Sequence, residues 1–336
     1  MPYLLISSDP DEYSVHRLTF VPFLPDGSCF AVRVDNDPLR LPSGVVEPDE
    51  SWLLDASFRI PLTTAGFQVQ RVHPFAIDCG QLFVWVDGDC DSHHGHHVDV
   101  DWVVGAPSMV AGQLREAGRA YLARVVDDAS RSFLSQAEAS YYADNRRLLE
   151  PAYLKGTTPQ QGSGSSSSPE EWRRRREMIV AALSRDGTFL DLGCANGLLM
   201  ESVHAWASER GVQIEPYGVD FAPGLVRLAQ QRLPQWAERI EVGNAIDYAP
   251  RSGMRFTFVH LLLDAVPVAR RRDLVDHALT SLVEPAGRVL VSHYGGTGDA
   301  TAAAQVRRLG LQVTGESNSV DSHASTAWVD MPRTSQ

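Results

Sequence analysis

Residues 187–233 contain the pattern that most restricts the fold of this chain: a short apolar strand, a glycine-rich turn, a helix and a second strand follow one another directly. The first strand reads TFLDL, and the turn reads GCANG. In the helix, apolar residues recur at Leu198, Leu199 and Val203. The second strand, PYGVD, ends in an acid, Asp220. Strands that alternate with helices predict an α/β domain with a mostly parallel sheet.

The turn has the residues for binding a nucleoside rather than a dinucleotide. Glycine lets the backbone approach a ligand closely, and an acid that ends the second strand can accept hydrogen bonds from ribose hydroxyls. A dinucleotide site uses G-x-G-x-x-G, which rests a pyrophosphate on the helix N-terminus. Here the pattern is D-x-G-x-x-x-G, with Asp191 in front of Gly193 and Gly197. The leading acid would repel a phosphate but can pair with an ammonium group.

These motifs resemble those of class I S-adenosylmethionine-dependent methyltransferases, and the resemblance spans about Pro169 to Pro332. EVGNAIDY follows the third strand, FTFVHLLLDAVP contains the fourth, and VEPAGRVLVSHYG contains the fifth. LGLQVTGES and STAWVDM would form a closing antiparallel pair. The resemblance implies a Rossmann-like domain with a seven-stranded, mostly parallel sheet, and S-adenosyl-L-methionine as the cofactor.

The resemblance also implies cofactor contacts, residue by residue. Asp191 would lie near the methionine amino group, and Asp220 would hold the ribose diol. Asn244 stands where the family often has Asp; it would contact adenine together with the backbone of Ala245. The remaining implied cofactor contacts are Gly193, Cys194, Ala195, Asn196, Gly197, Phe221 and His260.

Two residues at the end of the fourth strand are candidates for catalysis. His260 could act as a general base, because its ordinary pKa lies near neutrality; alternatively it lines the cleft or touches the cofactor. Asp264 could act as a base or bind a cationic acceptor. The candidate substrate-binding residues are Tyr141, Tyr142, His293 and Tyr294.

Charge and motif both disfavour a nucleic-acid acceptor and favour a small molecule. The net charge of −12 repels phosphate backbones over the average surface. The [DN]PP[YFW] motif of many nucleic-acid N-methyltransferases is replaced by HLLLD. The basic run Arg173–Arg176 is interpreted as the exposed face of a helix that starts at PEEW, with a nucleic-acid patch as the alternative.

The N-terminal region predicts an α+β domain that resembles a Nudix domain. A hairpin is expected around Pro25–Ser28, and strands at GQLFVWVDGD and VDVDWVV. A short helix near Ser51–Arg59 should end at Pro61. The resemblance rests on residues 41–67, where four residues match the signature box, the last two with one inserted residue: Gly44, Glu50, Arg59 and Gly66.

The Nudix-like box lacks most of the carboxylates that hold a divalent cation in that family. Ile60, Thr63 and Thr64 stand where the metal-holding glutamates would be. Hard cations need several oxygen ligands at one site. The resemblance therefore implies a domain without hydrolase activity and without a bound metal.

Four of the eleven histidines lie between His93 and His97. Adjacent histidines in a strand point to opposite faces, so His96 and His97 cannot easily share a metal. We interpret the stretch as a polar loop before a strand. Metal capture by Asp91, His93 and His94 is the alternative.

Composition divides the chain into residues 1–108, a connector at 109–168 and the methyltransferase-like residues 169–336. The connector would contain a long helix over Val110–Leu149, with Leu114, Ala117, Tyr121, Leu122 and Val125 on its apolar side. Lys155–Glu171, rich in Gly and Ser, is expected to be a linker or a mobile lid. Widely spaced cysteines, no visible signal peptide and no apolar run of about 18 residues predict a cytoplasmic protein without a membrane span. The extra domain is compatible with a homodimer.

Three functions are consistent with these patterns. The leading one is methyl transfer from S-adenosylmethionine to a small-molecule acceptor, for example a bacterial secondary metabolite. The second is a metal-dependent Nudix-type hydrolase with an auxiliary methyltransferase-like domain. The third is a sensor that binds the cofactor without turnover.

Overall fold

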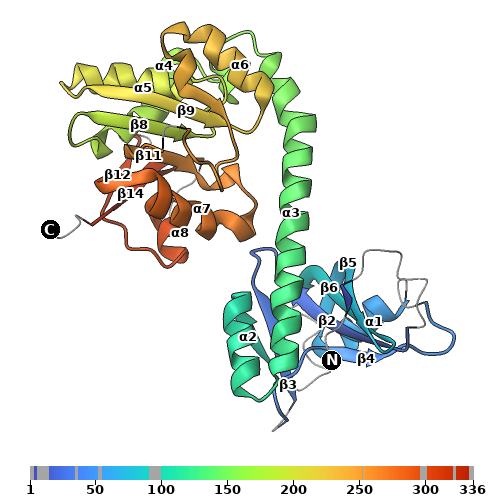
Figure 1. Ribbon diagram of the computed structural model, residues 1–336. Helices are drawn as coiled ribbons and strands as arrows, with labels where there is room; N and C mark the ends of the chain where they lie inside the picture. The colour runs from blue at the N-terminus through green and yellow to red at the C-terminus, as the bar shows by residue number, and fades with distance from the viewer. Residues whose placement is uncertain are drawn as a thin grey trace. The chain divides into compact units, whose positions relative to one another are not determined.

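The computed structural model describes residues 4–5, 15–34, 37–51, 55–90, 100–251, 253–295, 301–320 and 323–332. The chain forms two compact units, Met1–Ala137 and Glu138–Gln336. The division falls inside helix α3 (Ala120–Leu154), which Figure 1 shows as one continuous helix. The segment predicted as a separate connector therefore contributes to both units.

The N-terminal unit contains a mixed sheet, which has seven strands within the described residues. Its order is β1 (Leu4–Leu5), β5 (Phe67–Asp78), β6 (Gln81–Cys90), β2 (Arg17–Phe23), β3 (Cys29–Val34) and β7 (Val100–Gly105), with β4 (Ser43–Val45) paired to β2. Strands β2 and β6 run parallel, and the other pairs are antiparallel. The predicted hairpin is present, since Phe23 pairs with Cys29 across the turn. The histidine-rich stretch lies outside the described residues.

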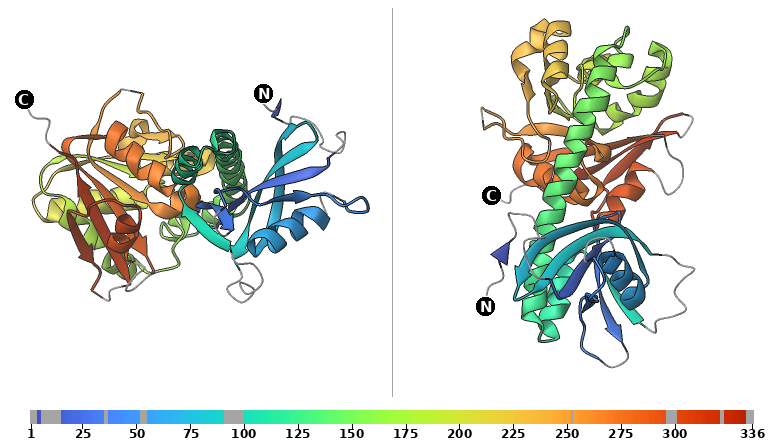
Figure 2. Two further views of the ribbon diagram at one scale, coloured as in Figure 1. Left: turned by 90° about the horizontal axis from the view of Figure 1, so that it is seen from below. Right: turned by 90° about the vertical axis from the view of Figure 1, so that its right-hand side faces the viewer.

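Both faces of this sheet are covered by helices. Figure 2 shows α1 (Ser57–Ala65) on one face and α2 (Pro107–Glu116) with the start of α3 on the other. On the α1 face, Ile60 packs against Phe20 and other apolar residues of the sheet. On the other face, Phe133 of α3 stacks on Phe23 with 4.2 Å between ring centroids. Alternate residues of one strand thus serve two separate cores.

Two helix predictions for this unit were wrong. The helix expected over Val110–Leu149 is broken into α2 and α3 at Gly118, which has a φ of +74°. Ala117 and Tyr121, expected on the buried side, are exposed because they flank this break. Pro61 does not end α1 but lies inside it. A proline removes one N–H donor without preventing the following residues from being helical.

The C-terminal unit contains a sheet that has seven strands within the described residues, as predicted. Its order is β10 (Ile240–Val242), β9 (Ile214–Asp220), β8 (Gly187–Leu192), β11 (Phe256–Leu262), β12 (Val283–Tyr294), β14 (Ala324–Asp330) and β13 (Gly315–Asn318). Only β14 runs against the other strands in this described sheet. The chain reverses its direction of winding between β8 and β11, which in open α/β sheets places the ligand site at their carboxyl ends.

Helices cover both faces of this sheet as well (Figure 1). The helical segments of this unit after α3 are η3 (Gln161–Ser163), α4 (Pro169–Arg176), η4 (Glu177–Ala182), α5 (Leu198–Glu209), α6 (Pro223–Arg232), η5 (Pro234–Arg239), η6 (Leu263–Ala265), η7 (Val268–Arg270), α7 (Arg271–His277), η8 (Ala278–Leu282) and α8 (Ala302–Arg308). Residues of α4, η4 and α5 share one buried cluster with Phe189 and Phe258. Residues of α7 and α8 share a second cluster with Leu190 and Val259. None of the described helices combines the length and hydropathy that a membrane span needs.

Candidate functional site

A cavity of about 200 Å³ lies at the carboxyl ends of β8, β9 and β11 in the C-terminal unit. The sheet side of the cavity is formed by the ends of these strands and the turns that follow them. Its lining residues there are Leu192, Gly193, Ala195, Asp220, Phe221, Ala222, Leu225, Gly243, Asn244, Ala245, Leu262, Asp264 and Ala265. Six residues predicted to contact a cofactor are among them: Gly193, Ala195, Asp220, Phe221, Asn244 and Ala245.

The glycine turn is shaped to leave space in this cavity. Gly193 has a φ of +87° and Gly197 one of +76°, a region that other residues rarely adopt. A Cβ added at Gly193 would meet only one atom within 4 Å, the Cβ of Ala265 at 3.9 Å. At Gly197 an added Cβ would lie 2.7 Å from the Leu233 side chain. Gly193 therefore keeps the cavity open, whereas Gly197 allows the end of α6 to pack closely against the turn.

Asp220 is the buried carboxylate of the cavity, with 6% of its surface exposed. Its Oδ2 accepts a hydrogen bond from the Ala195 N–H at 2.9 Å, and its Oδ1 accepts one from the Ala222 N–H at 2.9 Å. Burial raises the pKa of Asp220 to about 6, against the lowering effect of these two hydrogen bonds. The two amides fix the carboxylate, and each oxygen keeps a lone pair for a ligand hydroxyl.

The second half of α3 forms the opposite wall of the cavity. The residues that line it are Tyr141, Tyr142, Asn145, Leu149, Glu150 and Tyr153. The Tyr141 hydroxyl donates to the backbone carbonyl of Asp264. Glu150 Oε1 accepts from the Gly224 N–H at 2.8 Å. Sequence reasoning found only the two adjacent tyrosines, although positions 142, 145, 149 and 153 follow the helical repeat and could have been inferred from it.

Asn244, the predicted adenine contact, is already engaged by this wall. Its Oδ1 accepts from the Tyr142 hydroxyl at 2.7 Å and from the Ile246 N–H at 3.3 Å. Its Nδ2 lies 3.4 Å from Glu138 Oε1. An adenine amino group at this position must therefore share or displace the Tyr142 hydroxyl.

The Gly- and Ser-rich segment, expected to be a linker or a lid, is packed against the glycine turn. Asn196 is 1% exposed; its Nδ2 donates to the Pro159 carbonyl at 2.8 Å, and its Oδ1 accepts from the Ser163 hydroxyl at 2.6 Å. A Cβ added at Gly162 would lie 2.5 Å from Asn196 Nδ2. Asn196, predicted as a cofactor contact, instead fastens residues 159–163 to the turn. Gly162 permits this close approach because it has no side chain.

His260 does not line the cavity and is not placed to act as a base. It is 1% exposed, and both of its ring nitrogens are engaged within the sheet. Its Nδ1 lies 2.8 Å from Asp191 Oδ1, and its Nε2 lies 3.0 Å from Ser292 Oγ. Ser292 Oγ in turn lies 2.7 Å from Thr326 Oγ1. The side chains meet because β11 lies between β8 and β12, and β14 lies beside β12. The hydrogen bond from His260 holds the Asp191 carboxylate in position.

The remaining predicted site residues differ in whether they line the cavity. Asp264 is exposed and lines the cavity, so it stays a candidate for acid–base chemistry or cation binding. Cys194 is buried, and burial raises the pKa of its thiol well above the ordinary value. His293 is half-buried and outside the cavity lining. Tyr294 also lies outside the lining, and its hydroxyl oxygen is buried.

The basic run was interpreted as an exposed helix face, and this is wrong for its last member. α4 begins as predicted, with Ser168 accepting a hydrogen bond from the Glu171 N–H. Arg173 pairs with Glu177 and Glu209 at the surface. Arg176, however, is only 9% exposed. Four consecutive residues span a full helical turn, so one of them had to face the sheet.

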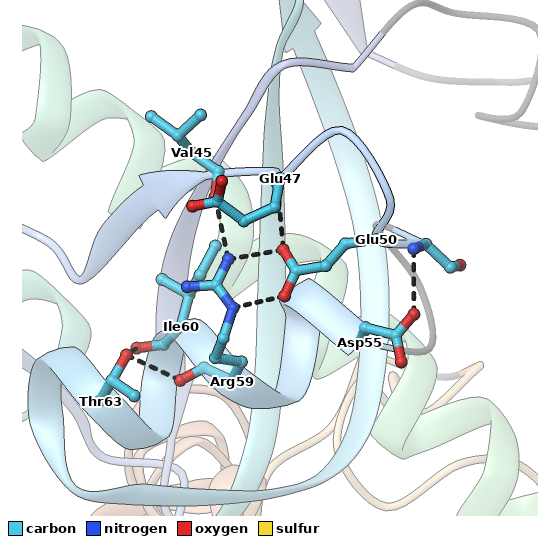
Figure 3. A network of polar contacts seen from close by, with 8 residues as sticks. Val45, Glu47, Glu50, Asp55, Arg59, Ile60 and Thr63 are labelled. Carbon is cyan, nitrogen blue, oxygen red and sulfur yellow. Dashed lines mark hydrogen bonds and ion pairs between the residues drawn. The ribbon is translucent and has the colours of Figure 1, made fainter.

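In the N-terminal unit, two matched residues of the Nudix-like box, Glu50 and Arg59, point toward each other (Figure 3). Arg59 binds both carboxylate oxygens of Glu50, and its Nη2 also donates to the Val45 carbonyl at 3.1 Å. The hydrogen bond from Arg59 lowers the pKa of Glu50 to about 2. Ile60 is buried, and its side chain would lie 3.0 Å from a Cβ added at Gly44.

The Glu50 carboxylate, whose side chain is 15% exposed, is thus paired with an arginine. The Thr63 and Thr64 hydroxyls donate to backbone carbonyls of their own helix. Among the residues that the structure describes, no group of three or more His, Cys, Asp or Glu side chains is placed to hold a metal ion.

No protein-family model matches the chain, and a search of curated proteins finds no match. Solved structures resemble the chain over about half of its length. They include the [4+2]-cyclase SpnF, with 12% identity over 56% of this chain and 97% of that one, and a TM-score of 0.41. A SAM-dependent methyltransferase from Aquifex aeolicus matches with 11% identity over 52% and 100% of the two chains, and a TM-score of 0.37.

A further similar structure is the glycopeptide N-methyltransferase MtfA, solved with S-adenosyl-L-methionine. It has 17% identity over 50% of this chain and 88% of that one, and a TM-score of 0.37. At these identities and TM-scores the similarity carries no inference about activity.

Proposed function

We propose that the C-terminal unit binds S-adenosylmethionine in this cavity and transfers its methyl group to a small-molecule acceptor. The observation that carries the proposal is the pairing of two features in one cavity. One is the open glycine turn at Gly193, and the other is the buried carboxylate of Asp220. Together they suit the backbone-close binding of a nucleoside with a free ribose diol.

The lining residues suit the parts of this cofactor. Asp220 would accept hydrogen bonds from the ribose hydroxyls, and Asn244 with Ala245 would contact the base. Asp191, which is buried outside the lining and held by His260, would attract the amino group of the methionine part. When bound, the cofactor supplies an electrophilic methyl group on a sulfonium centre.

The protein's own part in transfer would be to orient the acceptor and to hold its proton. Asp264 is the exposed carboxylate of the cavity, so it could take a proton from a hydroxyl acceptor or pair with an ammonium group. His260 would act indirectly, by fixing the position of Asp191. The small-molecule acceptor, the homodimer and the cytoplasmic location stay predictions.

The N-terminal unit is proposed to be a Nudix-like domain without hydrolase activity. Two of the four matched residues, Glu50 and Arg59, form an ion pair, and a third, Gly66, caps α1 at a φ of +63°. The ion pair between Arg59 and Glu50 disfavours the hydrolase alternative, because it neutralises a carboxylate that a cation would need.

Calorimetric titration of the full chain with S-adenosylhomocysteine tests the proposal. We expect binding in the micromolar range, unchanged by adding Mg²⁺ or by chelating divalent ions. Absence of binding to folded protein would refute the proposal. Binding without turnover on any acceptor would favour the sensor function, and Mg²⁺-dependent phosphate release from a nucleoside diphosphate derivative would favour the hydrolase.

The pKa of about 6 at Asp220 predicts a pH dependence for this binding. Hydroxyls donate best to the ionised carboxylate, so affinity should be constant above about pH 7 and weaken by up to about tenfold per pH unit below 6. The effect on stability has the opposite sign. Because the folded pKa exceeds the ordinary 3.8, this group's contribution to stability is fully present below about 3.8 and is lost as the pH rises through about 6.

Titrations between pH 5 and 8 measure the binding effect. The Asp220→Asn variant should bind weakly and without this pH profile. A dissociation constant of the unaltered protein that stays constant down to pH 5 would contradict an ionised Asp220 as the ribose acceptor.

A further inference from the structure

Arg176, the last residue of α4, differs from the other arginines of its helix. Arg173, Arg174 and Arg175 each form an ion pair with a glutamate and are between 42% and 50% exposed. Arg176 is 9% exposed and forms no hydrogen bond or ion pair among the residues that the structure describes. A largely buried guanidinium without a protein acceptor is unfavourable, because it loses most of its hydration and no protein hydrogen bond replaces it.

Two aromatic rings hold the Arg176 side chain in place. Its guanidinium carbon lies 3.7 Å from the centroid of the Trp172 ring and 4.3 Å from that of Tyr294. Burial lowers the pKa of Arg176, but guanidinium groups keep their proton in proteins. Rings contact a guanidinium through its flat faces, so they satisfy none of its N–H groups.

Tyr294 provides a second unused donor beside this cation. Its hydroxyl oxygen is buried, and no described residue makes a hydrogen bond of ordinary geometry with it, although Ser292 lies nearby. Burial raises the pKa of Tyr294 to about 12, while the charge of Arg176 opposes the rise. The phenol is therefore protonated at neutral pH and can donate.

The pair lies beside the proposed cofactor site. Tyr294 ends β12, two residues after Ser292, which contacts the His260–Asp191 pair. The charges of Asp191 and Asp264 both reach the Tyr294 hydroxyl, and Asp264 lines the cavity. Two carboxylates are thus nearby, yet neither forms an ion pair with Arg176 among the described residues.

We propose that Arg176 and Tyr294 form a binding site for a ligand carboxylate next to the methyl-transfer site. The planar guanidinium fork matches a carboxylate through two parallel hydrogen bonds, and the phenol adds a third donor. The inference rests on the proposed function. Two carboxylates have the right chemistry: that of the methionine part of the cofactor, and one carried by the methyl acceptor.

Calorimetry with two ligands and four proteins separates these sources. S-adenosylhomocysteine carries the methionine-derived carboxylate, and 5′-methylthioadenosine lacks the whole amino-acid part. The proteins are the unaltered chain, Arg176→Gln, Tyr294→Phe and the matched control Arg175→Gln on the exposed side of the same helix. If the methionine carboxylate is bound, Arg176→Gln should weaken S-adenosylhomocysteine at least about 30-fold and leave 5′-methylthioadenosine unchanged.

An acceptor carboxylate would give a different result. Both nucleosides would bind Arg176→Gln normally, and ¹³C-labelled acetate, followed by NMR, would bind the unaltered protein but not Arg176→Gln. Either pattern supports the carboxylate site, and Tyr294→Phe should show the same pattern with a loss of about three- to tenfold. The inference is overturned if neither S-adenosylhomocysteine nor acetate binding depends on Arg176.

Two controls keep the result interpretable. If Arg176→Gln does not fold, Arg176→Lys, which keeps the charge but not the fork, and Tyr294→Phe still test the donors. If the unaltered protein binds neither nucleoside, the proposed function fails, whereas the acetate titration still decides whether Arg176 holds a carboxylate.

Discussion

Replacing Asp220 with alanine is expected to weaken the binding of S-adenosylhomocysteine by about 100-fold or more. A buried carboxylate that accepts hydrogen bonds from two ribose hydroxyls makes charge-assisted contacts worth roughly 1.5–3 kcal/mol each. The substitution also removes the acceptor for the Ala195 and Ala222 amides. The glycine turn would then lose the contact that ties it to the end of β9. Calorimetric titration at pH 7.5 measures the change.

Asp247→Ala is the matched control for this result. Asp247 is an exposed carboxylate three residues after Asn244 and does not line the cavity. Its removal should leave the dissociation constant within about twofold, as expected for a distant, screened charge. Equal losses in the two variants would show a general charge effect, and an unaffected Asp220→Ala protein would remove Asp220 from the site.

Replacing His260 with leucine is expected to lower the free energy of unfolding of the C-terminal unit by about 3–5 kcal/mol. Asp191 is 3% exposed, and loss of the imidazole would leave its buried carboxylate without that partner. Ser292 would lose a partner at the same time. Differential scanning calorimetry measures the effect, and the transition of this unit can be assigned by its shift upon adding S-adenosylhomocysteine.

His293→Leu serves as the comparison, since His293 is half-buried two strands from Asp191 and has no polar partner among the described residues. We expect it to change stability by less than about 1 kcal/mol. A His260→Leu protein that keeps its stability but loses methyl transfer would contradict the structural role and restore the base hypothesis.

The succession of strands along the C-terminal unit was predictable from its sequence, because most of these strands are short apolar runs followed by a distinct turn. The glycine turn and Asp220 were predictable for the same reason. Their roles depend on local backbone geometry, and residues 191–197 and 220 lie within two adjacent strands and their turns. Because β8 and β9 pair in parallel, their carboxyl ends and the turns that follow them lie side by side.

On the opposite wall of the cavity, the helical repeat from Tyr142 indicates which α3 positions share a face, but it does not indicate what that face contacts. Glu150, for example, accepts a hydrogen bond from Gly224, which lies far along the chain. The buried state of His260 was missed because the sequence pattern around a histidine in an apolar strand does not show what its ring contacts. The partner can be a ligand or a side chain of a neighbouring strand. The burial of Arg176 was missed because four consecutive arginines were all interpreted as one exposed helix face, although one of them has to face the sheet.

The Gly- and Ser-rich segment shows how composition can mislead about where a domain begins. A truncated chain that starts at Pro169 would keep every described strand of the C-terminal sheet. It would lose the α3 residues that form one wall of the cavity, and Pro159 and Ser163, which hold Asn196. A fragment meant for ligand binding or crystallisation should therefore begin no later than Glu138. It then retains both the α3 wall of the cavity and its sheet side.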